Sequence, residues 1–398
     1  MSDRRMLRPA AKWLVFCVIL IELTGFGIVI PILPFMAPML GGDTRDIALV
    51  LVTYNVGSVL MAPFWGRLSD RIGRRRVLML CLLGMSLSYV ALALASTLPQ
   101  LYFARALAGM MAGTMPVASA LMADFSPPHQ RARAMGLVGT AFGVGLVLGP
   151  VLGGLLAGDA QGFARPAWFA CGLSLAAMLA AAVLLPVERK PATEAAREPQ
   201  RADGVLQFIQ RQEAWLLMAQ FVCHTMAYSA CIYLFPVWAH QLYDWGPHEV
   251  GLFFGGAGMV MIIVQGGLLG VLTQRFGLKP VLRSGAVVFA SAMALGGSFT
   301  LLPWGPAALF CCFAGATLCL PVLNTIASSW VSAQARGQMM GTTAAAAAVG
   351  RILGPLTTAV WFEVFGFRGA WWMNALVVGL LLLLSLSPTR FAEDPFVG

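Results

Sequence analysis

The stretch GLVGTAFGVGLVLGPVLGG, residues 136–154, decides the fold. It is apolar but contains seven glycines and a proline. In water each glycine would destabilise a helix by about 1 kcal/mol relative to alanine. In a lipid bilayer no water competes for the helical hydrogen bonds, and missing side chains let neighbouring helices approach closely. The stretch therefore predicts a closely packed transmembrane helix.

Two internal repeats divide the chain. The spacing Gly136, Gly145, Gly149-Pro150 occurs again 205 residues later, as Gly341, Gly350, Gly354-Pro355. The segment GRLSDRIGRRRVL at 66–78 also aligns with GVLTQRFGLKPVL at 270–282, an offset of 204 residues. Because the spaced pattern repeats at half the chain length, we expect two related halves, arranged about an axis along the membrane normal.

The composition is that of an integral membrane protein. Hydrophobic residues make up 59% and charged residues 11% of the chain, whereas soluble domains have about 25% charged residues. Apolar runs of membrane-spanning length are expected at 13–36, 47–64, 77–95, 100–123, 135–157, 168–187, 215–238, 250–272, 281–302, 306–331, 340–362 and 370–386. We predict an all-α membrane protein with twelve transmembrane helices in two pseudo-symmetric six-helix bundles, 1–187 and 213–398, joined by a cytoplasmic linker at 188–212.

The net charge of +9 is explained by the membrane topology. If both termini are cytoplasmic, nearly all Lys and Arg residues fall on the cytoplasmic side, as the positive-inside rule expects. The opposite side carries Arg45, Arg165 and Arg368, and Arg105 and Arg351 lie inside spans. The basic charge therefore does not indicate a nucleic-acid partner.

Catalytic and metal-binding patterns are missing from the sequence. All eight cysteines fall in apolar runs, so we expect no disulfide and no metal site. No Walker loop and no nucleophile elbow occur. We therefore expect a protein that is not an enzyme, that needs no cofactor and that uses the proton gradient instead of ATP.

Two charged residues of the first half are candidates for proton coupling. Glu22 is the only carboxylate well inside a span, where a charge costs about 3 kcal/mol and is seldom kept without a use. A packing role, with a protonated carboxyl bonded to the backbone, is the alternative. Arg105 on the fourth span is its natural counter-charge, since an arginine stays protonated. The alternative for Arg105 is a side chain that extends from the span end.

Polar residues of other spans are candidates for substrate binding. Gln220, His224 and Tyr228 form one stripe at i, i+4 and i+8, which either binds substrate or packs against a neighbouring helix. Arg351 is placed to bind an anionic group, to pair with Glu22, or to bond carbonyls near Pro355. Single polar residues line a pocket or join helices; they include Asn55 and Asn324.

Three motifs resemble the major facilitator superfamily over essentially the whole chain. The segment 66–75 resembles its signature loop, Arg105–Gly109 with residues 123–131 its fourth-span motif, and 136–154 the fifth-span motif of proton-coupled antiporters. The chain is most similar to the twelve-span drug:proton antiporters, particularly the tetracycline-efflux type, in which an acid stands where Glu22 does.

This resemblance implies residue roles and a location. In the family, charged residues at the cytoplasmic span ends close the inner gate, and the fifth-span motif is associated with proton-coupled antiporters. The alternative for the charged residues is a role in membrane topology alone, because arginines on this side also serve the positive-inside rule. Here the gating residues are Gly66, Asp70, Arg71, Gly73, Arg74, Asp124, Gly145, Gly149 and Pro150. The resemblance also implies the bacterial inner membrane, and we expect a monomer.

An exporter of a lipophilic small molecule in exchange for protons is the leading hypothesis. Tetracycline exporters have a further carboxylate in span three, where Ser88 stands here, so the resemblance argues for another drug, a siderophore, a sugar or an organic ion. The alternative is a proton-coupled uptake symporter or facilitator for a small metabolite. The direction of substrate movement under a proton gradient separates the two.

Overall fold

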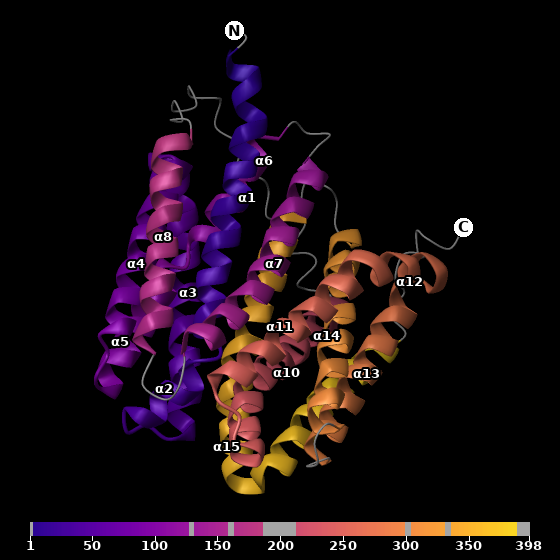
Figure 1. Cartoon of the computed structure of the whole chain (residues 1–398). Helices are drawn as coiled ribbons and strands as arrows, with labels where there is room; N and C mark the ends of the chain where they lie inside the picture. The colour runs from indigo at the N-terminus through magenta and orange to yellow at the C-terminus, as the bar shows by residue number, and fades with distance from the viewer. Residues whose placement is uncertain are drawn as a thin grey trace. The chain divides into compact units, whose positions relative to one another are not determined.

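The computed structural model describes residues 3–126, 131–157, 163–185, 212–298, 304–330 and 336–387. The regular structure in these ranges is helical (Figure 1). The helices of the first half are α1 (Asp3–Val29), α2 (Leu33–Met39), α3 (Thr44–Ile72), α4 (Arg74–Ala93), α5 (Leu98–Met111), α6 (Thr114–Asp124), α7 (Arg131–Ala157) and α8 (Ala164–Leu184). Those of the second half are α10 (Gln212–Tyr243), α11 (Pro247–Ile263), the π-helix η2 (Val264–Leu268), α12 (Leu269–Phe276), α13 (Leu278–Ser298), α14 (Trp304–Ser329) and α15 (Arg336–Leu386).

The all-α membrane fold is confirmed. Eleven helical segments of the described chain are long and apolar enough to cross a membrane. The last of these, in α15, contains two predicted spans, 340–362 and 370–386. With a rise of 1.5 Å per residue, 51 helical residues would extend for roughly 75 Å, far more than a bilayer core of about 30 Å. Gly366, which has φ 65° and ψ −173°, interrupts the helix between the two spans.

Three predicted spans are not single helices. The run 13–36 was expected as one span, but α1 ends at Val29 and α2 begins at Leu33, because Pro31 and Pro34 lack the N–H groups that a continuous helix needs. The fourth span is broken between α5 and α6, at Ala112–Gly113. The eighth span contains the π-helical turn η2.

The chain forms two compact units. The first comprises Met1–Thr193 with Ala239–Gly258, and the second comprises Glu194–Trp238 with Met259–Gly398. The predicted linker 188–212 lies outside the described residues, apart from Gln212. The three-part division of the chain therefore stays a prediction.

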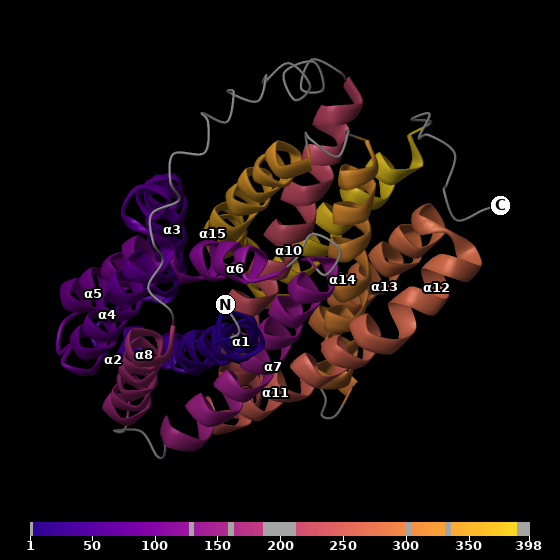
Figure 2. The ribbon, with the colours of Figure 1, turned by 90° about the horizontal axis from the view of Figure 1, so that it is seen from above.

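In the first unit α1 lies between α7 and α8 (Figure 2). The glycine-rich stretch of α7 forms its contact with α1. A methyl group added at Gly149 would lie 2.7 Å from the carbonyl oxygen of Thr24, and one added at Gly145 would lie 3.1 Å from that of Leu20. Any side chain at these positions would force the helices apart, so this contact needs glycine.

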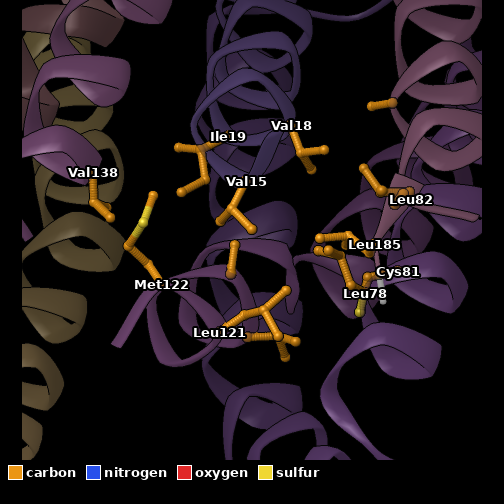
Figure 3. Close-up of a cluster of buried hydrophobic side chains, with 14 of the residues drawn as sticks. Val15, Val18, Ile19, Leu78, Cys81, Leu82, Leu121, Met122, Val138 and Leu185 are labelled. Atoms are coloured by element: carbon orange, nitrogen blue, oxygen red, sulfur yellow. The ribbon is translucent and has the colours of Figure 1, made fainter. Parts of the chain in front are cut away.

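The core of this unit fills the space between α1, α4, α6 and α7 (Figure 3). Apolar side chains from these helices meet there, with Leu185 at the end of α8. Those labelled in Figure 3 are Val15, Val18, Ile19, Leu78, Cys81, Leu82, Leu121, Met122, Val138 and Leu185.

In the second unit the same glycine contact is made between α10 and α15. A methyl group at Gly350 would lie 2.5 Å from the carbonyl oxygen of Val222, and one at Gly354 would meet that of Met226. The contacted carbonyls are those of Leu20 and Thr24 in α1 and those of Val222 and Met226 in α10. Each carbonyl of α10 lies 202 residues after its counterpart in α1. The repeat in sequence is thus a repeat in packing.

The loops between the second and third spans also match. Gly73 (φ 97°) and Gly277 (φ 82°) end α3 and α12, and their N–H groups donate to Ser69 and Thr273 over 3.1 and 3.0 Å. Positive φ values favour glycine because it has no Cβ. Each half also has an arginine that donates to a carbonyl near the end of its last helix: Arg75 to Ala182, and Arg283 to Ser385 at 3.0 Å.

Candidate functional site

Glu22 lies in the interior of the first unit. Its side chain projects from α1 with 7% of the residue exposed, and its Oε2 atom makes no hydrogen bond. Thr114, the first residue of α6, is the hydroxyl residue that lies near the carboxyl group. The break between α5 and α6 therefore places a helix N-terminus, with its partial positive charge, beside a buried carboxyl group.

Arg105 is buried in the same bundle, on α5. The residue is 4% exposed and its Nε atom has no hydrogen-bond partner. The guanidinium carbon lies 4.7 Å from the centre of the Tyr54 ring on α3, a cation–π contact. The approach of α3 is possible because Gly109 of α5 packs directly against the backbone of Tyr54. A permanent positive charge is thus held inside the bundle by an aromatic face.

Glu22 and Arg105 do not pair directly. Within the described ranges, no ion pair of 4.0 Å or less joins their side chains. Tyr89 of α4 interacts electrostatically with both of them and with Tyr54. Its residue is 1% exposed, and its hydroxyl group also lacks a hydrogen bond. One tyrosine thus interacts electrostatically with both charges.

Four helices thus bring unsatisfied polar atoms into one bundle. They are Glu22 Oε2, Tyr89 Oη, Arg105 Nε and Thr114 Oγ1. A buried polar atom without a partner costs about 1–3 kcal/mol, and native proteins have few of them. This concentration of unsatisfied polar atoms makes this part of the bundle the candidate site.

Sequence reasoning missed the two tyrosines. Tyr54 and Tyr89 stand in apolar runs, where an aromatic residue is usually packing material. The contacts that give them a role come from helices distant in sequence. Ser88, which stands where tetracycline exporters have a carboxylate, is buried and donates a 2.7 Å hydrogen bond to the carbonyl of Met85 in its own helix. Tyr89, the next residue of the same helix, is equally buried, but its hydroxyl group has no hydrogen-bond partner.

The polar stripe of α10 is in the second unit. His224 is 2% exposed, and its Nδ1 atom has no hydrogen bond. Its ring is parallel to that of Tyr228 at 6.4 Å between centroids and meets Phe289 edge-on at 5.9 Å. Tyr228 also contacts Phe313 and reaches the sulfur of Met261 at 3.8 Å. Gln220 is buried one turn earlier. The stripe is thus part of an aromatic cluster.

His224 occupies the position in α10 that Glu22 occupies in α1. The two residues are related by the 202-residue offset that relates the contacted carbonyls on either side of them. The repeat therefore places one ionisable group at the same point of each half, a carboxyl in the first and an imidazole in the second.

The remaining binding candidates are spread over several helices. Arg351 is half-buried in α15, and its carbonyl accepts a 3.1 Å hydrogen bond from Ser229 of α10. Asn55 donates to the carbonyl of Leu51 in its own helix at 2.9 Å, which fits a structural role. Asn324 is half-buried in α14. Substrate binding by these residues, and a pairing of Arg351 with Glu22, stay predictions.

One pair of the predicted gating residues is formed. Arg74 at the start of α4 and Asp124 at the end of α6 lie 2.9 Å apart, with both side chains partly exposed. Asp70 and Arg71 are exposed near the end of α3, and a methyl group added at Gly66 would meet no atom within 4 Å. Pro150 continues the glycine contact of α7, packing against Gly27. Gating by these residues stays a prediction.

Known proteins resemble the chain over nearly its whole length. A family model described as Major Facilitator Superfamily matches residues 15–269 and 266–396. The tetracycline resistance protein, class D, of Salmonella ordonez is 29% identical, covering 96% of this chain and 97% of the relative. The class H protein of Pasteurella multocida is 27% identical, covering 93% and 94%. A solved bacterial homologue of the human lysosomal transporter Spinster has the same fold, with a TM-score of 0.81, 15% identity and coverage of 95% and 97%.

Proposed function

The chain belongs to the major facilitator superfamily, and on that premise we propose that it exports a lipophilic small molecule from the cytoplasm in exchange for protons. The carrying observation is the buried carboxyl group of Glu22, whose Oε2 has no partner, in the same bundle as the buried Arg105. A carboxyl group whose hydrogen-bonding capacity is open can bind and release a proton in each cycle. The energy source is then the proton gradient.

The proposed cycle alternates between two states. Facing the cytoplasm, the protein binds its substrate from the cytoplasm or the inner leaflet and gives up the proton of Glu22. Facing outward, it releases the substrate while Glu22 takes up a proton. Arg105 stays charged throughout and biases Glu22 toward the ionised form until substrate or proton competes. The protein acts as a monomer in the bacterial inner membrane.

The relatives support export without naming the substrate. Two relatives that cover most of the chain are tetracycline resistance proteins, and a resistance role is compatible with removal of a compound from the cell. Ser88 is satisfied within its own helix and has no carboxylate function, so tetracycline itself is not proposed. The substrate class proposed is a lipophilic compound, and a panel of cations, zwitterions and anions is needed to define it.

Everted membrane vesicles with an acid interior test the proposal. Test compounds are added one at a time, and proton release is compared between wild type, Glu22→Gln and Glu249→Gln. Glu249 is the matched control, because its carboxylate already accepts a 2.8 Å hydrogen bond from the N–H of Gly246. We expect at least one compound to release protons from wild-type and Glu249→Gln vesicles but not from Glu22→Gln vesicles.

The same vesicles report the direction of transport. An exporter accumulates its substrate inside everted vesicles, whereas an uptake symporter would deplete it there. If Glu22→Gln releases protons as the wild type does, Glu22 is a packing residue. The proton site must then be sought at His224 or Asp124.

A further inference from the structure

Tyr89 has no part in the cycle described above, although it is the most enclosed member of the cluster. The residue is 1% exposed and its hydroxyl group has no hydrogen-bond partner. A buried tyrosine hydroxyl normally finds a partner. Its neighbour Ser88, equally buried, has one in the carbonyl of Met85. The lack of a hydrogen-bond partner is therefore specific to the Tyr89 hydroxyl group and is not shared by the neighbouring hydroxyl group of α4.

The hydroxyl group of Tyr89 faces α1 beside Glu22. A methyl group added at Gly25 would lie 3.2 Å from this oxygen, and Gly25 is three residues after Glu22, on the same side of the helix. The ionisable groups of the packed helices are arranged around this point. Cys81 and Tyr89 of α4 interact with Glu22, and Tyr54 of α3 and Arg105 of α5 interact with Tyr89.

Within the described residues α6, α7 and α8 also pack on α1, and α6 brings the Thr114 hydroxyl group near Glu22. The contact of α7 with α1 is made by glycines, and Cys171 of α8 is hydrogen-bonded to Ser86 of α4 at 3.1 Å. Arg105 interacts electrostatically with Tyr54 and Tyr89. Tyr89 is thus a residue that interacts electrostatically with both Arg105 and Glu22.

We propose that Tyr89 is a positioning residue that links the protonation of Glu22 to Arg105, an inference that rests on the proposed function of Glu22. When Glu22 is ionised, the Tyr89 hydroxyl donates its hydrogen bond to the carboxylate. In both states the oxygen of Tyr89 accepts a hydrogen bond from the Arg105 guanidinium, which makes its hydroxyl a stronger donor to the ionised carboxylate. When Glu22 binds a proton, the hydrogen bond from the hydroxyl to the carboxylate is released. The phenol keeps its own proton in both states, so only this one hydrogen bond changes.

An infrared pH titration of the purified full-length protein tests this link without requiring transport. The carbonyl stretching band of protonated Glu22 is identified as the band that Glu22→Gln removes. The pH at which the band disappears is then measured for wild type, Tyr89→Phe, Arg105→Gln and the double variant. Ser88→Ala serves as the control, because its hydroxyl bonds only within its own helix.

We expect Tyr89→Phe to raise the midpoint by about one pH unit, because the carboxylate loses a hydrogen-bond donor. Arg105→Gln should raise it as well, and the double variant should match Tyr89→Phe alone, since the arginine acts through the tyrosine. Ser88→Ala should leave the midpoint unchanged. Gly25→Ala, which pushes against the hydroxyl group, should shift the band in an otherwise intact protein.

Two results overturn the proposal. One is a Tyr89→Phe band with the wild-type position and midpoint, and the other is a double variant in which the two single shifts add. Failure of the proposed function is distinguishable, because it would appear as absent proton release in vesicles while the band still reports the hydrogen bond. A band that titrates without any transport would keep the Glu22–Tyr89 link and reject the antiport cycle.

Discussion

Helices α1 and α10 are equivalent in the two repeats, and each packs through its backbone carbonyls against glycines of α7 or α15. Glu22 of α1 lies among Tyr89, Thr114 and the cation–π pair of Arg105 and Tyr54. The equivalent His224 of α10 lies among aromatic rings. The backbone contact is therefore shared, while the chemistry around it is different.

The partners of Glu22 have no counterparts in the second half. At an offset of 204 residues Tyr89 corresponds to Met293, and at 204 or 205 Arg105 corresponds to Leu309 or Phe310. Apolar residues thus stand where the first half has a hydroxyl and a charge. The comparison teaches that glycine positions fix the helix contact, while the residues beside it diverge. We infer that the first half binds protons and the second half recognises substrate.

The strongest way to break this comparison is to make the same substitution at both equivalent positions. Glu22→Gln should lower proton-coupled transport by about 100-fold or more, equivalent to about 3 kcal/mol. His224→Gln should keep proton release and change the apparent substrate affinity by about 3- to 10-fold, since only a ring contact of about 1 kcal/mol is lost. Both are measured in everted vesicles. Equal losses of proton release would reject the division of roles.

The next largest effect concerns the shared contact itself. Gly149→Ala and Gly354→Ala should each destabilise the protein by about 2–3 kcal/mol, because the added methyl group meets backbone atoms that cannot move aside. Gly136→Ala and Gly341→Ala are the matched controls, since a methyl group there meets nothing within 4 Å. Denaturant titration in detergent measures the free energy of unfolding. If only one of the two substitutions lowers the free energy of unfolding, the two glycine contacts do not contribute equally to stability.

The sequence predicted the helices and their internal repeat better than it predicted the candidate site. Glycine spacing and the repeated loop could be recognised because both are local patterns with a fixed offset. The breaks after Val29 and around Gly113 were missed because an apolar run does not reveal where a helix is interrupted inside a membrane. Trp65 compensates for the second break by donating a 2.6 Å hydrogen bond to the carbonyl of Met110, a contact between distant residues.

The site was predictable only where one residue carried the signal. A carboxyl and a guanidinium inside apolar runs are conspicuous, so Glu22 and Arg105 could be selected. Tyr54 and Tyr89 resemble ordinary packing aromatics in the sequence, and only the contacts of α3, α4 and α5 give them a part in the cluster. Arg105 was expected as the counter-charge of Glu22, but the two side chains form no ion pair, and Tyr89 interacts electrostatically with both.

A smaller effect should distinguish the matched loops from the rest of the chain. Gly73→Ala and Gly277→Ala should each cost about 1–2 kcal/mol, because both positions have positive φ values that a Cβ disfavours. Gly66→Ala and Gly270→Ala, in the helices α3 and α12 that precede the two loops, are controls whose added methyl groups meet no atom within 4 Å. Thermal unfolding in detergent gives the comparison. A loss of thermal stability in Gly73→Ala but not in Gly277→Ala would show that the loop at Gly277 tolerates backbone strain that the loop at Gly73 does not.

The smallest effect concerns a contact that the second half has and the first half lacks. Thr358 and Asn374 lie in α15 on either side of Gly366, and the Asn374 amide donates to the Thr358 hydroxyl at 3.0 Å and to the Ala370 carbonyl at 2.9 Å. At an offset of 205 residues Thr358 corresponds to Gly153, which packs directly on the backbone of Ile28. A hydrogen bond thus replaces a glycine contact.

In a double-mutant cycle, Thr358→Val and Asn374→Ala should be coupled by about 0.6 kcal/mol, the average for such bonds in membranes. Asn374→Ala should cost more than Thr358→Val, because it also leaves the Ala370 carbonyl without its amide donor. Additive losses would mean that the two spans of α15 are held by packing alone, as Gly153 and Ile28 are in the first half.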